Sequence, residues 1–426
     1  MYLSISGQDT QRIFTVFEST VTIQDLTLTE GFAKGGSGGN GGGGGGGGAG
    51  CGGALLILNS TVDVENVIFD GNAAEGGDGG ADTSGFGGGG GGTLDVAGGN
   101  LSGDAGGAGG DSELGAGGLG GTVLSEDGGP GSLGGGGGGG GRQARGGDGG
   151  DYGGGGGGGS RTANLPDAGR GGNGGFGAGG GGAGGSTGAG EGTPGVGGTF
   201  GGNGGNAPDG FGSGGGGGGG AGLGGAVFVS TSSIFNATSC EFTNNAATGG
   251  NGGEPSFAEL FGADGQAKGG AIFARTGALV SIDGGRFDNN SATNALQTNA
   301  DNNAYFGSVV VDDVILVIDE LSDEPDVAPG DSEVATAGGK VTLRAIAEEF
   351  SALNWGGSAT FDPALFGGKG SQVLQLNPSL GPLTLDNVKL ELDGPGAGAL
   401  SISGQGFHPA LQVAQFQCDP ARPNLA

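Results

Sequence analysis

Residues 38–58 of this chain pass from almost pure glycine into four adjacent apolar residues without a linker: GGNGGGGGGGGAGCGGALLIL. Glycine fills 123 of the 426 positions, and it loses more conformational freedom on ordering than any other residue. Collagen is excluded, because a Gly-X-Y period with abundant proline is absent and the whole chain has 14 prolines. Any fold for this chain must therefore connect glycine segments directly to a hydrophobic core.

Three segments repeat one pattern. Each begins Gly-Gly-Ala, runs through two short alternating apolar stretches and ends Phe-x-x-Asn; the segments are 52–74, 224–247 and 269–292, with 14–33 as a looser fourth copy. One copy of such short strands cannot close a core, whereas stacked copies bury their apolar faces against each other. The repeats predict an all-β fold, a parallel β-solenoid.

Particular side chains follow from this pattern. The residues expected to face inward are Val62, Val64, Val67, Phe69, Ile234, Phe235, Phe242, Leu279, Ile282 and Phe287. Asn72, Asn245 and Asn290 recur at the same turn, where a stacked ladder of amides would satisfy buried backbone groups.

The repeats resemble the GGA[ILV]…FxxN repeats of polymorphic outer-membrane proteins. The matching residues are Gly53-Ala54-Leu55 with Phe69 to Asn72, Gly225-Ala226-Val227 with Phe242 to Asn245, and Gly270-Ala271-Ile272 with Phe287 to Asn290. This resemblance implies a right-handed parallel β-helix on a bacterial surface, with coils at 54–74, 224–247 and 269–292 and first rungs at 1–33.

Glycine-rich insertions at 34–53, 75–223 and 248–268 each leave after a strand pair and return just before a Gly-Gly-Ala. We expect them side by side on one flank. Within them glycine has a period of three, as in GGDGGD at 146 and GGNGGN at 201. A polyproline II helix also has three residues per turn, so bare backbone edges could hydrogen-bond laterally as a polyglycine II bundle. A disordered linker is the alternative, since ordering costs about 1–2 kcal/mol per residue; we favour the bundle.

The last part of the chain, 305–426, contains less glycine. The sequence KVTLRAIAEEFSAL at 340–353 predicts a helix with Leu343, Ile346, Ala347 and Phe350 on one face. Thr342 to Glu349, Phe361 to Gly368 and Asp393 to Gly404 resemble the segment named for its CSLREA motif, which precedes the coils of many bacterial β-helix surface proteins. The motif's cysteine is absent, and Ala345 stands where a glutamate is usual. The resemblance implies a capping helix followed by further rungs.

The sequence LSISGQ occurs at 3–8 and again at 400–405, and Phe14-Thr15-Val16 aligns with Leu411-Gln412-Val413 at the same offset. The chain resembles a repeat unit cut at a rotated position. It is either one unit of a longer tandem protein or a subunit whose last rungs continue into the first rungs of the next copy, and both interpretations predict head-to-tail contacts. A stray fragment with two similar rungs is the alternative. The residues expected at the assembly interface are Leu3, Ile5, Phe14, Val16, Leu400, Ile402, Leu411 and Val413.

The formal net charge of −30 disfavours nucleic acid and anionic membranes as partners. No stretch approaches the roughly 20 apolar residues of a membrane-spanning helix, and no signal peptide is visible. We expect an extracellular or cell-surface protein. Cys51, Cys240 and Cys418 are too few for a disulfide framework and are expected to be buried or free thiols.

Sites for chemistry are few. Asp319, Glu320, Asp323, Glu324 and Asp326 could bind calcium, but their spacing differs from the EF-hand and a solvated loop is the simpler interpretation. The single histidine, His408, lies outside the repeats, and Arg12, Arg275 and Arg286 occupy different coils without an obvious carboxylate pair beside them, so we expect no catalysis and no other cofactor.

These observations favour a structural subunit of an extracellular fibre that assembles from copies of itself. The alternative is a surface adhesin whose glycine-rich loop tips bind a receptor or glycan. The candidate aromatic residues for such tips are Phe86, Tyr152, Phe176, Phe200 and Phe211.

Overall fold

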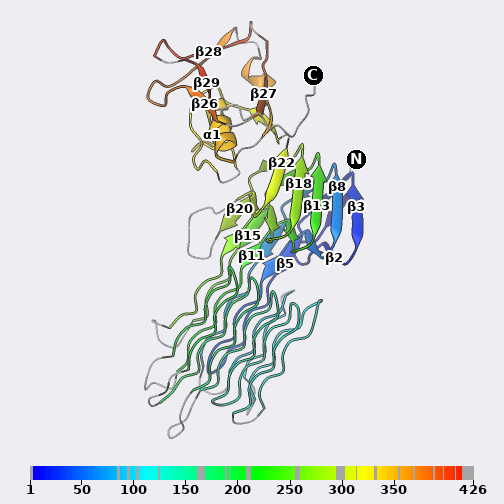
Figure 1. Ribbon diagram of the computed structural model, residues 1–426, viewed down its shortest axis with the longest axis vertical. Coiled ribbons are helices and arrows are strands. Elements are labelled where there is room, and N and C mark those ends of the chain that lie inside the picture. Colours follow the sequence, from blue (N-terminus) through cyan, green and yellow to red (C-terminus); the bar gives the residue numbers. More distant parts are fainter. Residues whose placement is uncertain are drawn as a thin grey trace.

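The computed structural model of the protein describes residues 3–414, apart from 84–86, 94–95, 102–104, 123–124, 161–167, 188–189, 191, 208–212, 255–259, 294–302, 313, 331–332, 354–355, 368–369, 387–388, 397 and 408. The expectation of an all-β chain is confirmed: the named strands pair in parallel, and little of the chain is helical. Figure 1 shows short strands side by side in the upper half and long glycine-rich segments extending below them.

Three sheets of five strands form the main strand body. The β1 sheet contains β1 (Leu3–Ser6), β4 (Leu26–Thr29), β9 (Ile68–Asp70), β14 (Glu241–Thr243) and β19 (Arg286–Asp288). The β2 sheet contains β2 (Phe14–Phe17), β7 (Leu55–Leu58), β12 (Val227–Val229), β17 (Ile272–Ala274) and β21 (Tyr305–Phe306). The β3 sheet contains β3 (Thr20–Gln24), β8 (Thr61–Glu65), β13 (Ile234–Thr238), β18 (Leu279–Asp283) and β22 (Val309–Asp312). Strand order within each sheet follows chain order, so each repeat adds one strand to every sheet.

Two smaller sheets lie where the glycine-rich segments leave and return. The β5 sheet contains β5 (Phe32–Lys34), β10 (Ala73–Glu75), β15 (Ala246–Thr248) and β20 (Ser291–Thr293), and the β6 sheet contains β6 (Gly50–Cys51), β11 (Gly222–Leu223) and β16 (Ala267–Lys268). Successive glycine-rich segments therefore start and end in neighbouring strands. Where they join the strand body, neighbouring glycine-rich segments are therefore roughly 4.8 Å apart, the distance between hydrogen-bonded strands.

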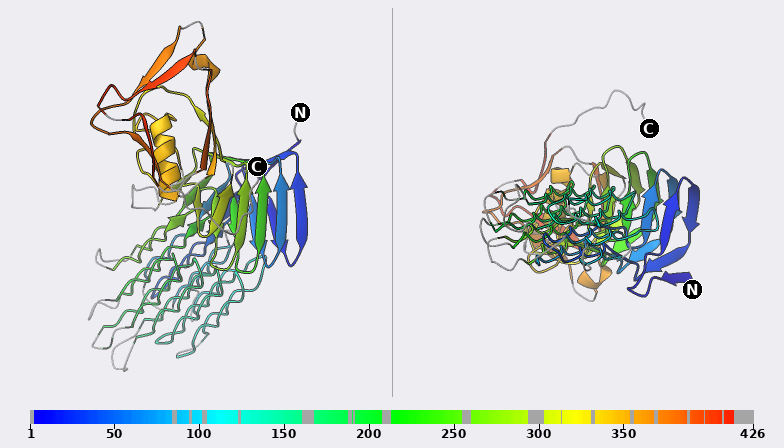
Figure 2. Two further views of the ribbon diagram at one scale, coloured as in Figure 1. Left: turned by 45° about the horizontal axis from the view of Figure 1, so that its top comes forward. Right: turned by 90° about the horizontal axis from the view of Figure 1, so that it is seen from below.

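The C-terminal segment continues with parallel pairing. Its strands are β23 (Val314–Ile318), β24 (Gly356–Phe361) and β27 (Lys389–Asp393) in one sheet, β25 (Gln372–Gln375) with β28 (Leu400–Ser403), and β26 (Leu383–Asp386) with β29 (Leu411–Ala414); α1 (Leu343–Leu353) and a 3-10 turn at Pro363–Leu365 complete it. In Figure 2 this segment stands beside the later strands of the body, away from the glycine-rich segments.

The helix begins three residues later than the sequence predicts. The hydroxyl of Thr342 accepts the backbone N–H of Ala345 at 3.1 Å, so Thr342 acts as the N-cap and the residues before it are not helical. Arg344, on the first turn, is buried and donates to the Asp323 carboxylate at 2.7 and 3.0 Å. Neither helical element in the described parts of the chain has the length and apolar character needed to cross a membrane.

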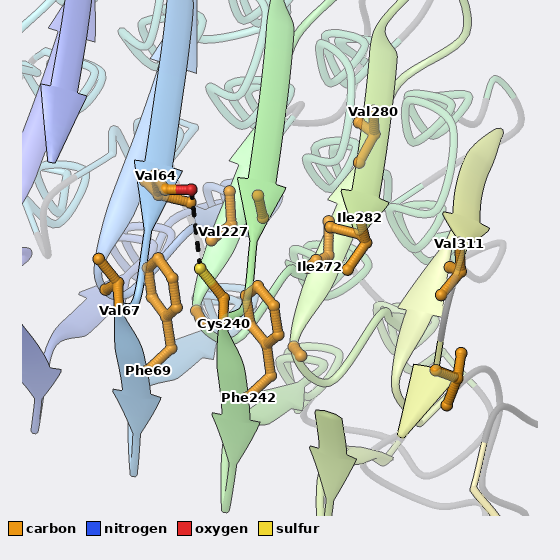
Figure 3. Close-up of a cluster of buried hydrophobic side chains, with 14 of the residues drawn as sticks. Val64, Val67, Phe69, Val227, Cys240, Phe242, Ile272, Val280, Ile282 and Val311 are labelled. Carbon is orange, nitrogen blue, oxygen red and sulfur yellow. Dashed lines mark hydrogen bonds between the residues drawn. The ribbon is translucent and has the colours of Figure 1, made fainter. Parts of the chain in front are cut away.

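The core runs through the strand body into the C-terminal segment as one cluster of buried side chains. Phe69 stacks on Phe242 with ring centroids 4.8 Å apart, and Phe242 on Phe287 at 5.0 Å. Figure 3 shows Phe69 and Phe242 beside the valines and isoleucines of neighbouring strands. Two of the expected inward residues were assigned wrongly: Ile234 is only partly buried and Leu279 is exposed, and Phe235 and Val280 fill those places. The buried alternation is Phe235 and Ala237 in β13 and Val280 and Ile282 in β18, so the first residue of each strand falls outside it.

The four apolar residues Leu55–Leu58 are buried because the β2 sheet is covered on both faces. Leu55 and Ile57 belong to the core between the sheets, whereas Leu56 and Leu58 belong to a second cluster on the opposite face. A strand covered on both sides reads as a continuous apolar run rather than an alternation. The second cluster lies against the glycine-rich segments.

Candidate functional site

The glycine-rich segments hydrogen-bond to one another through their backbones with a step of three residues. The segment 43–49 shows the rule most fully. The N–H groups of Gly44 and Gly47 donate to the carbonyl oxygens of Gly215 and Gly218. Those of Gly45 and Gly48 donate to the carbonyl oxygens of Gly39 and Gly36, and those of Gly46 and Ala49 donate to Gly155 and Tyr152. Three consecutive residues thus donate in three directions. Three further segments donate back to the carbonyl groups of 43–49. Their donors are the N–H groups of Gly77 and Gly80, of Gly88 and Gly91, and of Gly179 and Gly182.

We call this array of hydrogen-bonded segments the glycine lattice. Within the described residues its segments fall into four layers. They are 35–40, 76–83, 96–101 and 249–254; then 43–49, 87–92, 106–111, 213–221 and 260–266; then 116–122, 135–141, 153–160, 178–187 and 201–207; and last 128–132, 145–150, 168–175 and 192–198. The segments run side by side in Figures 1 and 2.

Position in the lattice explains the local sequence. Interior segments, such as 43–48 and 135–141, are uninterrupted glycine, because a Cβ on Gly45 would collide with the carbonyl oxygen of Gly89. Outer-layer segments carry a side chain at every third residue, which points away from the lattice. Asp148 and Asn251 are exposed examples.

Outer side chains also bind backbone N–H groups of the neighbouring segment. The Asp78 carboxylate accepts from the backbone and the amide of Asn251 at 2.8 and 3.0 Å. The Asp148 carboxylate accepts the N–H of Asn173, whose own amide oxygen accepts the N–H of Val196. These side chains supply acceptors where the lattice has no further segment.

The turns of the lattice nearest the strand body carry aromatic side chains. Tyr152, Phe176 and Phe200 pack on the outer face of the β2 sheet, against Phe228, Phe273 and Phe306. Phe228, Phe273 and Phe306 stack in turn along the sheet at 5.2 and 5.3 Å. The prediction that Tyr152, Phe176 and Phe200 lie at exposed loop tips is therefore wrong: Tyr152 is 3% exposed. Phe86 and Phe211 lie outside the described residues.

A sequence signal for these turns exists but is easily missed. A single bulky residue is followed directly by glycine at Leu114, Leu133, Tyr152, Phe176 and Phe200. Between neighbours in this series the distances are 19, 19, 24 and 24 residues (133 − 114, 152 − 133, 176 − 152 and 200 − 176). Each interval spans one excursion, by which we mean a glycine-rich segment that runs away from the strands together with the next segment, which runs back.

Cations reinforce the same junction. The Arg275 guanidinium lies 4.0 Å from the centroid of the Phe176 ring and pairs with Asp151 at 3.0 Å. Arg12 donates to the carbonyl oxygens of Cys51 and Gly52 and pairs with Glu113. Burial lowers the pKa of Arg12, although the Glu113 carboxylate opposes that shift.

Each of the three arginines considered for catalysis has at least one carboxylate partner. Arg12, Arg275 and Arg286 pair with Glu113, Asp151 and Asp288, respectively. Each pair joins neighbouring segments or lies within one strand. His408 is outside the described residues, and catalysis stays untested.

Asn72, Asn245 and Asn290 lie together in one buried ladder. The Asn72 amide donates to the side-chain oxygen of Asn245 at 3.0 Å, and the Asn245 amide donates to that of Asn290 at 3.0 Å. The same oxygens accept the backbone N–H groups of Asn72 and Asn245. The ladder thereby satisfies buried backbone donors at the turn between the β1 and β5 sheets.

The predicted assembly residues fall on edge strands of different sheets. β1, β2 and β3 each begin a sheet, and β27, β28 and β29 each end one, so among the described strands each has a partner on one side only. Leu3 is 67% exposed and Leu411 is 53% exposed, whereas Val16 is buried. The side chain of Val413 is outside what the structure describes.

The strands at the two ends share more than sequence. β1 and β28 both read LSIS. The Ser6 hydroxyl accepts the N–H of Gln8 at 2.9 Å, and the Ser403 hydroxyl accepts that of Gln405 at 3.2 Å. Gln8 and Gln405 adopt left-handed φ angles of 56° and 55°, so the two turns have the same conformation.

The similarity extends past the turn. The Gly7 carbonyl accepts the N–H of Thr10, and the Gly404 carbonyl that of Phe407, both at 3.1 Å. β2 and β29 then start at the same offset, at residues 14 and 411. Apart from residue 408, residues 3–17 and 400–414 therefore have one local structure at two ends of the protein.

The acidic residues considered for calcium are engaged with neighbouring groups. Asp319 accepts from Lys340 and from the N–H of Val341, Asp323 pairs with Arg344, and Asp326 accepts from Ala328 and Ala335. In the part of the chain that the structure describes, no three His, Cys, Asp or Glu side chains gather closely enough to hold a metal ion. Calcium binding by this loop stays a prediction.

Cys51 and Cys240 are buried free thiols, and Cys418 lies outside the described residues. Burial raises the pKa of Cys51 to about 12, despite the opposing charge of Arg12. The Cys240 thiol lies 3.8 Å from the carbonyl oxygen of Val64, as Figure 3 shows. No protein-family profile, curated protein or solved structure matches this chain.

Proposed function

We propose that the protein is a structural subunit of an extracellular fibre, in which copies stack head to tail through their terminal strands. The supporting observation is the recurrence of one local structure, in 3–17 and 400–414 apart from residue 408, on edge strands that each pair on one side only. A surface that repeats at both ends and is related by translation generates an open chain of subunits rather than a closed ring.

In this proposal the strand body is a right-handed parallel β-helix and the glycine lattice is a polyglycine II bundle. Parallel sheets with strands in chain order and the amide ladder support the first assignment. Hydrogen bonding in steps of three residues supports the second. The resemblance to polymorphic outer-membrane proteins and to CSLREA-type segments, together with the net charge of −30, supports a bacterial surface location.

The adhesin alternative is less well supported. Tyr152, Phe176 and Phe200, three of the five aromatic residues expected at binding tips, instead join the lattice to the strands. A receptor or glycan partner thus has no aromatic platform among the described turns that were proposed for it.

The proposal is tested by sedimentation velocity and negative-stain electron microscopy over a range of protein concentrations. The parent protein is expected to form filaments. Leu3→Asp and Leu411→Asp, each placing a charge on one terminal strand, are expected to prevent them. Leu119→Asp is the matched control, because Leu119 is 79% exposed on the lattice.

Mixing the two variants sharpens the test. Leu3→Asp retains an intact C-terminal end and Leu411→Asp an intact N-terminal end, so their mixture is expected to give dimers and no filaments. Monodisperse particles from the parent at every concentration would overturn the fibre proposal. Circular dichroism establishes that each variant is folded.

A further inference from the structure

The strands at the two ends are related in a way that specifies a joint between copies. The C-terminal segment ends with β27, β28 and β29, one strand in each of its three sheets, and the chain starts with β1, β2 and β3, one in each main sheet. Since β28 matches β1 and β29 matches β2, the order of sheets around the two ends is the same. Each end of the protein thus presents three edge strands, one from each of three sheets.

An apolar hollow opens beside the last of these strands. It has a volume of about 150 Å³ and is lined by Leu343, Leu385, Leu392, Ile402 and Leu411, contributed by α1, β26, β27, β28 and β29. At the other end of the protein, Ile5 and Phe14 pack against the core but stay partly exposed. Both ends therefore present incompletely covered core side chains.

Resting on the fibre proposed above, we infer that β28 and β29 of one copy pair in parallel with β1 and β2 of the next, with Ile402 opposite Ile5 and Leu411 opposite Phe14. β27 then lies beside β3, and the apolar hollow is closed by the first repeat of a second copy.

Existing pairings set this register. Ile402 is opposite Leu374 in β25, and Ile5 is opposite Leu28 in β4. Joining the copies makes one apolar column, Leu374–Ile402–Ile5–Leu28. Leu411 is opposite Leu383, and Phe14 is opposite Leu55, which makes a second column. A shift by one residue would place serine in the first column.

Strand direction and polarity agree with this arrangement. Every pairing between named strands is parallel, so an antiparallel, two-fold contact between identical ends would break the pattern. The exposed serines Ser4 and Ser401 lie between the paired apolar residues and face outward. The joint consequently brings them opposite each other.

The test is a disulfide between copies. In adjacent strands roughly 4.8 Å apart, opposed residues lie within the Cα distance a disulfide accepts. Ser4→Cys with Ser401→Cys, in a Cys418→Ser background, is expected to give a ladder of covalent oligomers on mild oxidation. Ser4→Cys with Ser403→Cys, two residues out of register, is the matched control and is expected to give at least tenfold less.

The outcomes separate this joint from the fibre itself. Two results would overturn the joint and leave the fibre standing, if filaments are still seen in the microscope. One is a ladder of covalent oligomers from the control pair, Ser4→Cys with Ser403→Cys; the other is no ladder from either pair. Absence of both filaments and ladders would overturn both. A ladder that disappears when Leu411→Asp is added, while the protein stays folded, supports the joint.

Discussion

The ring of Tyr152 lies edge-on against that of Phe228, with centroids 5.5 Å apart and planes at 89°. This contact attaches a turn of the glycine lattice to a strand of the β2 sheet. Similar contacts of Phe176 and Phe200 continue the row along the sheet. The lattice and the strands therefore fold as one body held together by an aromatic layer.

Replacing Tyr152 by alanine tests that layer. Loss of the large buried ring leaves a cavity, so we expect the free energy of unfolding, measured by denaturant titration, to fall by about 3–5 kcal/mol. Tyr152→Phe keeps the ring and removes only the hydroxyl that contacts Arg275 at 3.4 Å, so a loss below about 1 kcal/mol is expected. Equal losses for the two variants would contradict the packing role.

Gly45→Ala tests whether lattice interiors exclude side chains. The added Cβ would meet the carbonyl oxygen of Gly89, and the neighbouring segments would have to separate. We expect a loss of about 4 kcal/mol or more and faster hydrogen exchange across 35–49. Gly99→Ala is the matched control in an outer layer, where the nearest atom is 3.1 Å away; it should change exchange little.

Asn245→Leu tests the amide ladder. Its removal leaves the backbone N–H and the side-chain amide of Asn72 without their acceptor. A buried group without a partner costs about 1–3 kcal/mol, so the denaturation midpoint should fall clearly. Asn236→Ala, at an exposed amide that donates to Asp63, should alter stability by about 0.5 kcal/mol or less; similar losses for both would count against the ladder.

Cys51 gives a prediction about alkaline pH. Burial raises the pKa of its thiol from the ordinary value of 9.0 to about 12, so the folded protein holds this proton more tightly than the unfolded chain. The resulting stability is complete below pH 9 and is lost as pH rises toward 12, with a slope of up to about 1.4 kcal/mol per pH unit. Stability curves of the parent and of Cys51→Ala should therefore converge or cross in this range.

The same thiol should resist alkylation. In a Cys418→Ser background, iodoacetamide at pH 8.5 should modify Cys51 only after denaturant is added, because the thiolate is the reactive form. Rapid modification of the folded protein would show that Cys51 is accessible and would contradict its burial at the root of the lattice.

Much of the fold could be predicted from periodicity. Copies of Gly-Gly-Ala…Phe-x-x-Asn imply strands in matching places, and Asn72, Asn245 and Asn290 recur where buried backbone donors need acceptors. A glycine period of three indicates which edge of a segment carries side chains. Each of these patterns is local, so one sequence suffices to detect it.

The remaining features depend on partners distant in the chain. Tyr152, Phe176 and Phe200 resemble tip residues in sequence, because a lone aromatic in glycine says nothing about which end of an excursion it occupies. Leu279 resembles a core residue because its strand could be read in either alternation. The carboxylate partners of Arg12 and Arg275 are remote in sequence, and only the lattice brings them close.

Hydrogen bonding in steps of three residues also restricts how this protein can change its length. Inserting one or two residues into an interior segment would rotate the donors away from their acceptors, whereas a whole triplet restores every direction. A triplet added to both arms of an excursion would move its far turn outward by about 9 Å, since a polyproline II helix rises 3.1 Å per residue. The depth of the glycine lattice can therefore change in whole-triplet steps while the strands to which it is attached stay unaltered.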